Sequence, residues 1–253
     1  MKLYAHEAGS AGPVVVLLHG FAGSHATWQE VIPLLAPKFR VIAYDLPGHR
    51  NSHPWPETGK PRIAVDAILD DLTQRGIEHF HLAGHSMGGA ISMLMALAQA
   101  ERIASLSLFA PGGFGPEINA RLLGRHASAV SHPDVRACLE AMTGWDSPVS
   151  DKSVADLAEW RGKDGQTEAL EALARSITRD GRQGAIPRES MAGLEMPVTV
   201  AWGTIDNVLP VSQTVGLPPN FALHILPGAG HMLPQEVPEF VAKLITRAAR
   251  GRA

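Results

Sequence analysis

Ser86 stands at the centre of a Gly-His-Ser-Met-Gly segment, residues 84–88. A predicted strand at 79–83 precedes this segment, and a helical pattern begins at Met87. A serine at a tight turn between a strand and a helix exposes its hydroxyl for nucleophilic attack, and the flanking glycines let the two elements approach closely. The G-x-S-x-G spacing alone is common, but its place between a strand and a helix favours a nucleophile over a simple packing turn.

A serine hydroxyl needs a base, and the base needs an acid that orients it. His231 follows the apolar run at 224–226 and Asp206 follows the run at 198–202, so both are expected at the carboxyl ends of neighbouring parallel strands. Open α/β sheets build their sites at this edge. The chain order Ser86, Asp206, His231 predicts a catalytic triad with serine as nucleophile, histidine as base and aspartate as orienting acid.

Acyl transfer also requires fixed donors for an oxyanion, preferably backbone N–H groups. Phe21 lies in a His-Gly-Phe segment directly after the apolar run at 14–18, where a donor loop belongs. Met87 begins the helix after Ser86, and the first N–H groups of a helix lack intrahelical acceptors. We therefore predict an oxyanion hole formed by the N–H groups of Phe21 and Met87.

Short apolar segments that alternate with helical patterns must position these residues, and they predict an α/β fold with a mostly parallel central sheet flanked by helices. The predicted strands lie at 14–18, 41–44, 79–83, 106–109, 198–202 and 224–226. The predicted helices lie at 27–35, 61–75, 87–99 and 235–249.

Residues 112–187 show helical periodicity without a convincing strand. We predict an α/β core from residues 1–111 and 188–253, with residues 112–187 inserted as a helical cap, or lid. A cap over Ser86 would shape an apolar substrate pocket. The candidate lining residues are Phe114, Met142, Trp145, Trp160, Leu209 and Met232.

Composition limits the partners. The 22 Lys and Arg against 25 Asp and Glu leave no basic surplus for nucleic acid. Residues 82–100 lack charges but contain glycines of a tight turn, so no membrane span is expected. The single cysteine and the polar N-terminus predict a cytoplasmic protein without a secretion signal. The histidines lack the spacing of metal ligands, so we expect no metal. We also expect a small-molecule substrate and no organic cofactor. The oligomeric state stays open.

The chain resembles the α/β-hydrolase superfamily from about Val14 to Leu244. The resemblance rests on His19-Gly20-Phe21, Asp45-Leu46-Pro47-Gly48-His49, Gly84-His85-Ser86-Met87-Gly88-Gly89, Trp202-Gly203-Thr204-Ile205-Asp206 and Gly228-Ala229-Gly230-His231. It implies the same triad roles and a helical cap after the sixth strand, which matches residues 112–187.

Two departures from the superfamily stand out. The turn after Asp-x-x-Gly-His usually continues with glycine and then, two residues later, serine, whereas Arg50, Asn51 and Ser52 follow His49 here. The usual pair of N-terminal strands is expected to be reduced to one, around residues 3–6.

Residues 180–232 resemble the hydrolase-like domain of acyltransferase subunits from acetoin-cleaving dehydrogenase complexes. No lipoyl-bearing segment precedes this part of the sequence, so we do not expect that complex's role to carry over.

The functional prediction is a serine hydrolase that cleaves a small to medium carboxylic ester through an acyl-enzyme. Two alternatives remain. A hydrolase of carbon–carbon bonds in β-diketones or ring-cleavage products can use the same triad, although such families often have asparagine where His85 stands. A ligand-binding protein on a hydrolase fold is the other alternative, because fold does not fix function.

Overall fold

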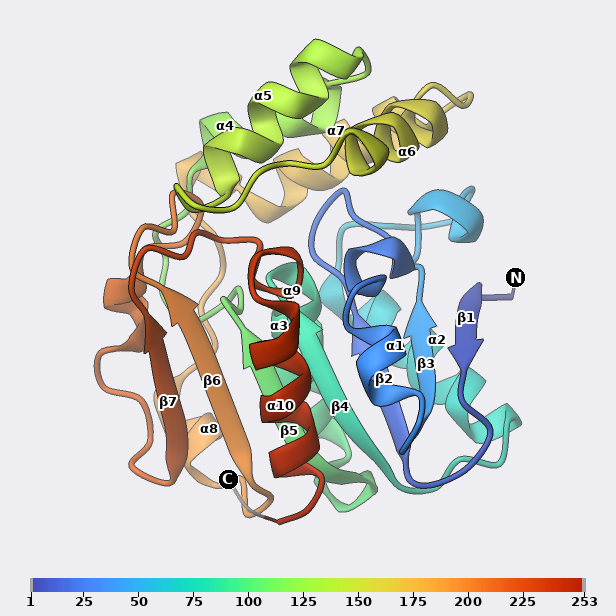
Figure 1. The fold of residues 1–253 in the computed structure, drawn as a ribbon, viewed down its shortest axis with the longest axis vertical. Helices are drawn as coiled ribbons and strands as arrows, with labels where there is room; N and C mark the ends of the chain where they lie inside the picture. Colours follow the sequence, from blue (N-terminus) through green and yellow to red (C-terminus); the bar gives the residue numbers. More distant parts are fainter. Residues whose placement is uncertain (1, 252–253) are drawn as a thin grey trace.

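A seven-stranded sheet forms the centre of the protein in a computed structural model that describes residues 2–251. The strand order is β1-β3-β2-β4-β5-β6-β7 (Figure 1). The strands are β1 (Ala5–Ala8), β2 (Val14–Leu18), β3 (Arg40–Tyr44), β4 (Phe80–His85), β5 (Ile103–Phe109), β6 (Val198–Gly203) and β7 (Phe221–Leu226). Strands β2 to β7 pair in parallel, and β1 pairs antiparallel with β3. The predicted α/β fold with a mostly parallel sheet is confirmed.

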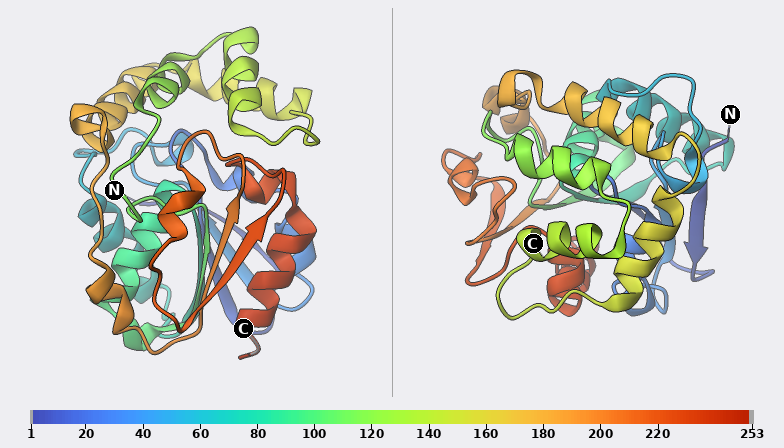
Figure 2. Two further views of the ribbon diagram at one scale, coloured as in Figure 1. Left: turned by 90° about the vertical axis from the view of Figure 1, so that its left-hand side faces the viewer. Right: turned by 90° about the horizontal axis from the view of Figure 1, so that it is seen from above.

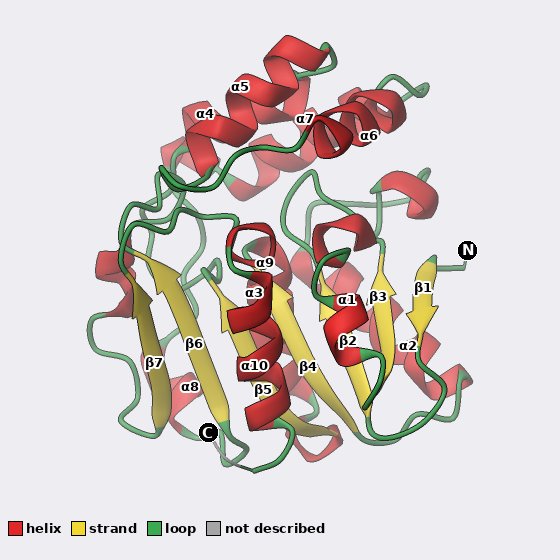
Figure 3. Ribbon diagram, viewed as in Figure 1, coloured by secondary structure: helices red, strands yellow, loops and turns green. Residues whose placement is uncertain are grey.

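Helices cover both faces of the sheet (Figures 2 and 3). One face carries α2 (Pro61–Gln74), α3 (Met87–Ala98) and α8 (Arg188–Ala192), and the other carries α1 (Ile32–Leu35) and α10 (Pro238–Ala248). Among residues 2–251, no helix has the length and apolar character needed to cross a lipid bilayer.

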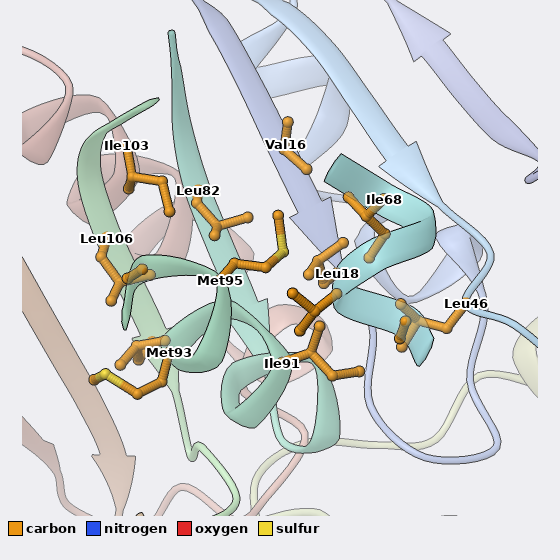
Figure 4. Close-up of a cluster of buried hydrophobic side chains, with 14 of the residues drawn as sticks. Val16, Leu18, Leu46, Ile68, Leu82, Ile91, Met93, Met95, Ile103 and Leu106 are labelled. Carbon is orange, nitrogen blue, oxygen red and sulfur yellow. The ribbon is translucent and has the colours of Figure 1, made fainter. Parts of the chain in front are cut away.

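Strand β2 shows why the sheet is buried on both sides. Val16 and Leu18 point into the cluster under α2 and α3, whereas Val15 and Leu17 point into the cluster under α1 and α10. An uninterrupted apolar run is typical of such a strand. Figure 4 shows the first cluster, in which side chains from the sheet and from the two helices interdigitate; those labelled are Val16, Leu18, Leu46, Ile68, Leu82, Ile91, Met93, Met95, Ile103 and Leu106.

Two predicted helices are broken at prolines. The helix expected at 27–35 is a 3₁₀ turn, η1 (His25–Trp28), followed by α1, which has Pro33 in its first turn. The helix expected at 235–249 is divided into α9 (Leu233–Glu236) and α10, which starts at Pro238. Proline has no N–H to continue a helix, so it is found at the first turn of a new one.

Four helices lie across the carboxyl ends of the parallel strands, at the top of Figure 1. This four-helix layer consists of α4 (Ala120–Ser128), α5 (His132–Met142), α6 (Asp151–Arg161) and α7 (Gln166–Ile177). It follows β5, the fifth strand rather than the sixth, because β1 is the one strand before β2 in the described part of the chain. The layer therefore faces the edge at which Ser86, Asp206 and His231 lie.

The turn between β4 and α3 depends on its glycines. A Cβ added at Gly84 would lie 2.4 Å from the carbonyl oxygen of Gly88, and one added at Gly88 would lie 2.4 Å from the carbonyl oxygens of Leu18 and His19. Real Cβ atoms do not approach backbone oxygens this closely, so α3 packs against β2 only because residue 88 has no side chain.

We predict that Gly88→Ala lowers the free energy of unfolding by about 2–3 kcal/mol, because the backbone must move to accept the methyl group. Gly124→Ala is the matched control: Gly124 lies within α4 and has no atom within 4 Å of its added Cβ. That change should raise stability by about 0.5–1 kcal/mol. Urea unfolding measures both, and equal effects of the two substitutions would contradict the packing argument.

Candidate active site

Ser86 occupies a strained backbone conformation between β4 and α3. Its φ is 53° and its ψ is −118°, a region that residues with a side chain rarely adopt. Hydrogen bonds hold it there: the Ser86 N–H donates to the carbonyl oxygen of Phe109 at 3.0 Å, and the Ser86 carbonyl accepts from the N–H groups of Ala90 and Gly112. The prediction of a strand, a serine turn and a helix at this place is confirmed.

His231 and Asp206 meet at the carboxyl ends of β7 and β6. The Nδ1–H of His231 donates to Oδ2 of Asp206 at 2.8 Å, and both side chains are almost fully buried. The other carboxylate oxygen accepts from the N–H groups of Val208 and Leu209, each at 2.8 Å. These bonds fix the aspartate and the ring, and they leave Nε2 of His231 as the nitrogen that can accept a proton.

Ser86 and His231 line one cavity of about 430 Å³ between the sheet edge and the four-helix layer. Within residues 2–251, the Ser86 hydroxyl makes no hydrogen bond to another side chain. The hydroxyl is thus available to a molecule in the cavity. The structure thus brings Ser86, Asp206 and His231, the three residues predicted from the sequence to form a triad, to one site.

Two further residues hold the His231 loop, and sequence analysis gave neither of them this role. His85 donates from Nε2 to the backbone carbonyl of His231 at 2.8 Å. Glu236 accepts from the N–H groups of Gly230 and Met232, each at 2.8 Å, so its carboxylate bonds on both sides of His231. For Glu236, the sequence feature that could have indicated this role is its position five residues after His231, in the last helical region.

The N–H groups of Phe21 and Met87 belong to peptide units that are fixed through their carbonyl oxygens. The Gly20 carbonyl, in the same peptide unit as the Phe21 N–H, accepts from Nδ1 of His19 at 2.7 Å and from the N–H of Gly23 at 3.2 Å. The Ser86 carbonyl, in the unit of the Met87 N–H, accepts the two bonds described above. Because a trans peptide directs its N–H away from its carbonyl, both N–H orientations are set in advance.

Buried histidines support this loop. His19 accepts the Leu46 N–H at Nε2 at 2.9 Å, and His49 accepts the Ala22 N–H at Nε2 at 3.2 Å. Burial lowers the pKa of His19 to about 4 and the pKa of His49 to about 3. Burial also lowers the pKa of His85 to about 3. These three imidazoles are therefore neutral near neutral pH and act as fixed donors and acceptors.

The cavity lining is mostly apolar. The charged residues of the described lining are Lys60 and Asp156, and each is ion-paired: Lys60 with Glu57 at 3.1 Å and Asp156 with Arg50 at 2.6 Å. Apolar side chains make up much of the rest, from the core and from the four-helix layer: Ile63, Ile91, Leu94, Ile118, Leu123, Leu139, Leu157, Leu173, Ile177 and Ile186. The site therefore suits a neutral, largely apolar molecule.

Three of the six predicted pocket residues line this cavity with Ser86: Met142, Leu209 and Met232. The structure places the other three elsewhere. Trp145 is 86% exposed on the loop after α5, and Trp160 is buried among residues of α4, α7 and Ala22. Phe114 packs against Trp202 with ring centroids 6.2 Å apart. Trp160 packs between helices of the four-helix layer, and Phe114 packs on the core. Sequence periodicity does not determine such packing partners.

Comparison with known proteins identifies the family. The family model described as "Alpha/beta hydrolase family" matches residues 15–244. The chain belongs to this family and is a hydrolase of the α/β fold, as the resemblance implied.

The "Dihydrolipoyllysine-residue acetyltransferase component of acetoin cleaving system" of Pseudomonas putida is 35% identical over 233 residues, which cover 92% of this chain. The chain spans 62% of the length of that relative. A "2-hydroxy-6-oxononadienedioate/2-hydroxy-6-oxononatrienedioate hydrolase" of Cupriavidus pinatubonensis is 27% identical, with 91% of this chain and 84% of the relative covered.

Among solved structures, a 2-hydroxy-6-oxo-6-phenylhexa-2,4-dienoate hydrolase from a Rhodococcus species superposes with a TM-score of 0.86 at 24% identity. The alignment covers 98% of this chain and 94% of that protein. At this level of identity the likeness shows the fold.

We predict that the protein loses stability as the pH falls from 7 to 5. The unfolded histidines take up protons below about pH 6.5, whereas His19, His49 and His85 stay neutral in the folded state down to about pH 4 or 3. Each contributes a fall of about 1.4 kcal/mol per pH unit in the free energy of unfolding. Urea midpoints at several pH values measure the slope.

His85→Gln is the control for this slope, since glutamine can still donate to the His231 carbonyl but does not titrate. In this variant, the slope of the free energy of unfolding against pH should be smaller by the contribution of one histidine. A flat wild-type profile between pH 7 and pH 5 would contradict the assignment of neutral buried imidazoles.

Proposed function

We propose that this α/β hydrolase cleaves a small to medium carboxylic ester through an acyl-enzyme, with Ser86 as nucleophile, His231 as base and Asp206 as orienting acid. The observation that carries the proposal is the Asp206–His231 hydrogen bond beside a cavity that Ser86 also lines. A neutral imidazole whose Nδ1–H is held by a carboxylate can accept a proton at Nε2.

In the first step, Ser86 Oγ attacks the ester carbonyl carbon while its proton passes to Nε2 of His231. The carbonyl oxygen becomes an oxyanion, and we assign its stabilisation to the N–H groups of Phe21 and Met87. The C–O bond to the alcohol then breaks, and His231 donates its proton to the leaving alkoxide. Water, deprotonated by His231, attacks the acyl-enzyme and releases the carboxylic acid and the free serine.

We also propose that residues 112–187 act as the cap of this site and that residues 1–111 and 188–253 form its core. The contribution of Leu139, Met142 and Leu157 to the cavity lining supports this division, because these residues come from α5 and α6. A cap made of apolar side chains would select the acyl and alcohol groups by their shape rather than by charge.

A second candidate is cleavage of carbon–carbon bonds in ring-cleavage products. The specific observation in its favour is the 27% identical relative, named as a hydrolase of a dioate. A dianionic substrate calls for cationic partners, whereas Lys60, the cation of the described lining, is 76% exposed at its side chain and pairs with Glu57. The ester is therefore the first candidate.

We predict that the wild-type protein hydrolyses p-nitrophenyl esters in a series from acetyl to dodecanoyl, with a maximum at one chain length, and that Ser86→Ala lowers kcat by at least about 10³-fold. Ser128→Ala is the control, because Ser128 is exposed on α4 and its hydroxyl donates to the backbone carbonyls of Gly124 and Arg125 in the same helix. Ester turnover that survives Ser86→Ala would refute the assignment.

The same assay separates the two candidates. If no ester is cleaved while a serine-directed phosphonate still labels Ser86, the nucleophile is competent and the substrate class is wrong. A ring-cleavage dienoate, followed by loss of its chromophore, then becomes the test substrate.

Asp206→Asn should lower kcat by about 10³–10⁴-fold with little change in KM, since an amide no longer enforces the Nδ1–H tautomer or stabilises the protonated ring. Thermal unfolding of the variant checks that the loop at 206–209 is intact. Near-wild-type turnover in a folded variant would show that Asp206 is not the orienting acid.

A further inference from the structure

Arg50 has a backbone conformation that costs energy for any residue with a side chain. Its φ is 43°, in the left-handed region that glycine adopts most readily. It begins the 3₁₀ turn η2 (Arg50–Ser52) after His49, in the loop that follows β3. Such a conformation persists only where other interactions of the residue compensate for the backbone strain.

The guanidinium makes such interactions with Asp156 of α6 and with Ser24. Nη1 and Nη2 of Arg50 donate to the two carboxylate oxygens of Asp156, each at 2.6 Å, and Nη1 also donates to Oγ of Ser24 at 3.2 Å. The two side chains of the ion pair are 21% and 32% exposed. Paired, parallel bonds of this kind fix the relative orientation of the two groups as well as their distance.

Asp156 and Ser24 both line the cavity that contains Ser86. Ser24 precedes η1, and its Oγ accepts the Ala26 N–H at 3.2 Å. Ser153 and Leu157, on the same helix as Asp156, line the cavity as well. Arg50 thus connects the two sides of one cavity wall, the start of η1 and the middle of α6.

The other side-chain hydrogen bonds from this region to the loops after β2 and β3 lie further along the chain. Arg161, at the end of α6, donates to the Ala22 carbonyl at 3.1 Å, and Gln166, at the start of α7, donates to the Gly48 carbonyl at 2.9 Å. The middle of α6, where the helix borders the cavity, is tied to the η1 and η2 loops by the Arg50–Asp156 pair.

We propose that Arg50 is a positioning residue for substrate size: through the Arg50–Asp156 pair it holds α6 against the η1 loop and limits the cavity on that side. The size limit rests on the proposed ester hydrolysis, whereas the restraint on α6 does not. Breaking the pair should let α6 move outward and admit longer acyl chains.

The experiment compares Arg50→Gly, Asp156→Asn, the double variant and the wild-type chain. Glycine relieves the strain at φ 43°, so Arg50→Gly removes the side chain without disturbing the backbone. The matched control is Asp151→Asn on the same helix, since Asp151 pairs with Arg136 inside the four-helix layer and not with the core. Two quantities are measured: amide hydrogen exchange over residues 157–161, and the ratio of kcat/KM for long against short p-nitrophenyl esters.

Both single variants should speed exchange at 157–161 and raise the long-to-short ratio, each by about two- to fivefold, the range expected for a partly exposed ion pair. The double variant should match Arg50→Gly, because Asp156→Asn has no ion pair left to remove once the guanidinium is absent. The control should resemble the wild type in both measurements.

Unchanged exchange at 157–161 would overturn the proposal whatever the kinetics show, and so would an equal effect of Asp151→Asn. Faster exchange with an unchanged chain-length ratio would also overturn it, because the pair would then serve stability alone. If the wild type cleaves no ester, the proposed function fails, and the exchange measurement alone decides whether the pair restrains α6.

Discussion

The approach of α3 to β2 at Gly88 is the constraint on which the rest of the site depends. The carbonyl oxygens of Leu18 and His19 occupy the space where any side chain of residue 88 would lie. This contact places the start of α3 beside the end of β2, so the Ser86 turn and the loop after His19 come from neighbouring elements. Phe21 and Met87 consequently line the same cavity as Ser86.

Neutral imidazoles connect the loops around this contact. A neutral histidine has one donor and one acceptor, so a buried ring can join two backbone segments without bringing a charge into the protein interior. His19 joins Gly20 to Leu46, and His49 joins Pro47 to Ala22. Water would compete for these backbone groups at the surface. Their burial makes the loop geometry a property of the folded state and not of a bound ligand.

The sequence was sufficient for the parts of the site that are tied to strand ends. Asp206 and His231 were located because each lies in the loop that follows a predicted strand, and parallel strands bring their carboxyl ends to one edge. The single N-terminal strand was also expected, although β1 lies at 5–8 rather than near residues 3–6.

Other features could not be read from the sequence because they depend on contacts between distant segments. The roles of His85 and Glu236 follow from which loop N–H and carbonyl groups lack a backbone partner, and that is decided only when the loops meet. The position of Trp160 in the four-helix layer could not be predicted for the same reason. An amphipathic pattern identifies a helix, but whether an aromatic side chain meets a substrate or a neighbouring helix depends on how the four helices cross.

Arg161 limits how the four-helix layer could be transferred to the core of another hydrolase. Its guanidinium is almost fully buried, and its hydrogen bonds go to the carbonyl oxygens of Ala22, His126 and Ala129 and to the His126 ring. A cation buried in this way depends on acceptors from both the four-helix layer and the loop after β2. The layer is therefore not an independent module: grafted onto another hydrolase core, it would leave a buried guanidinium N–H group without its acceptor unless the recipient loop offered a carbonyl oxygen in the place of Ala22.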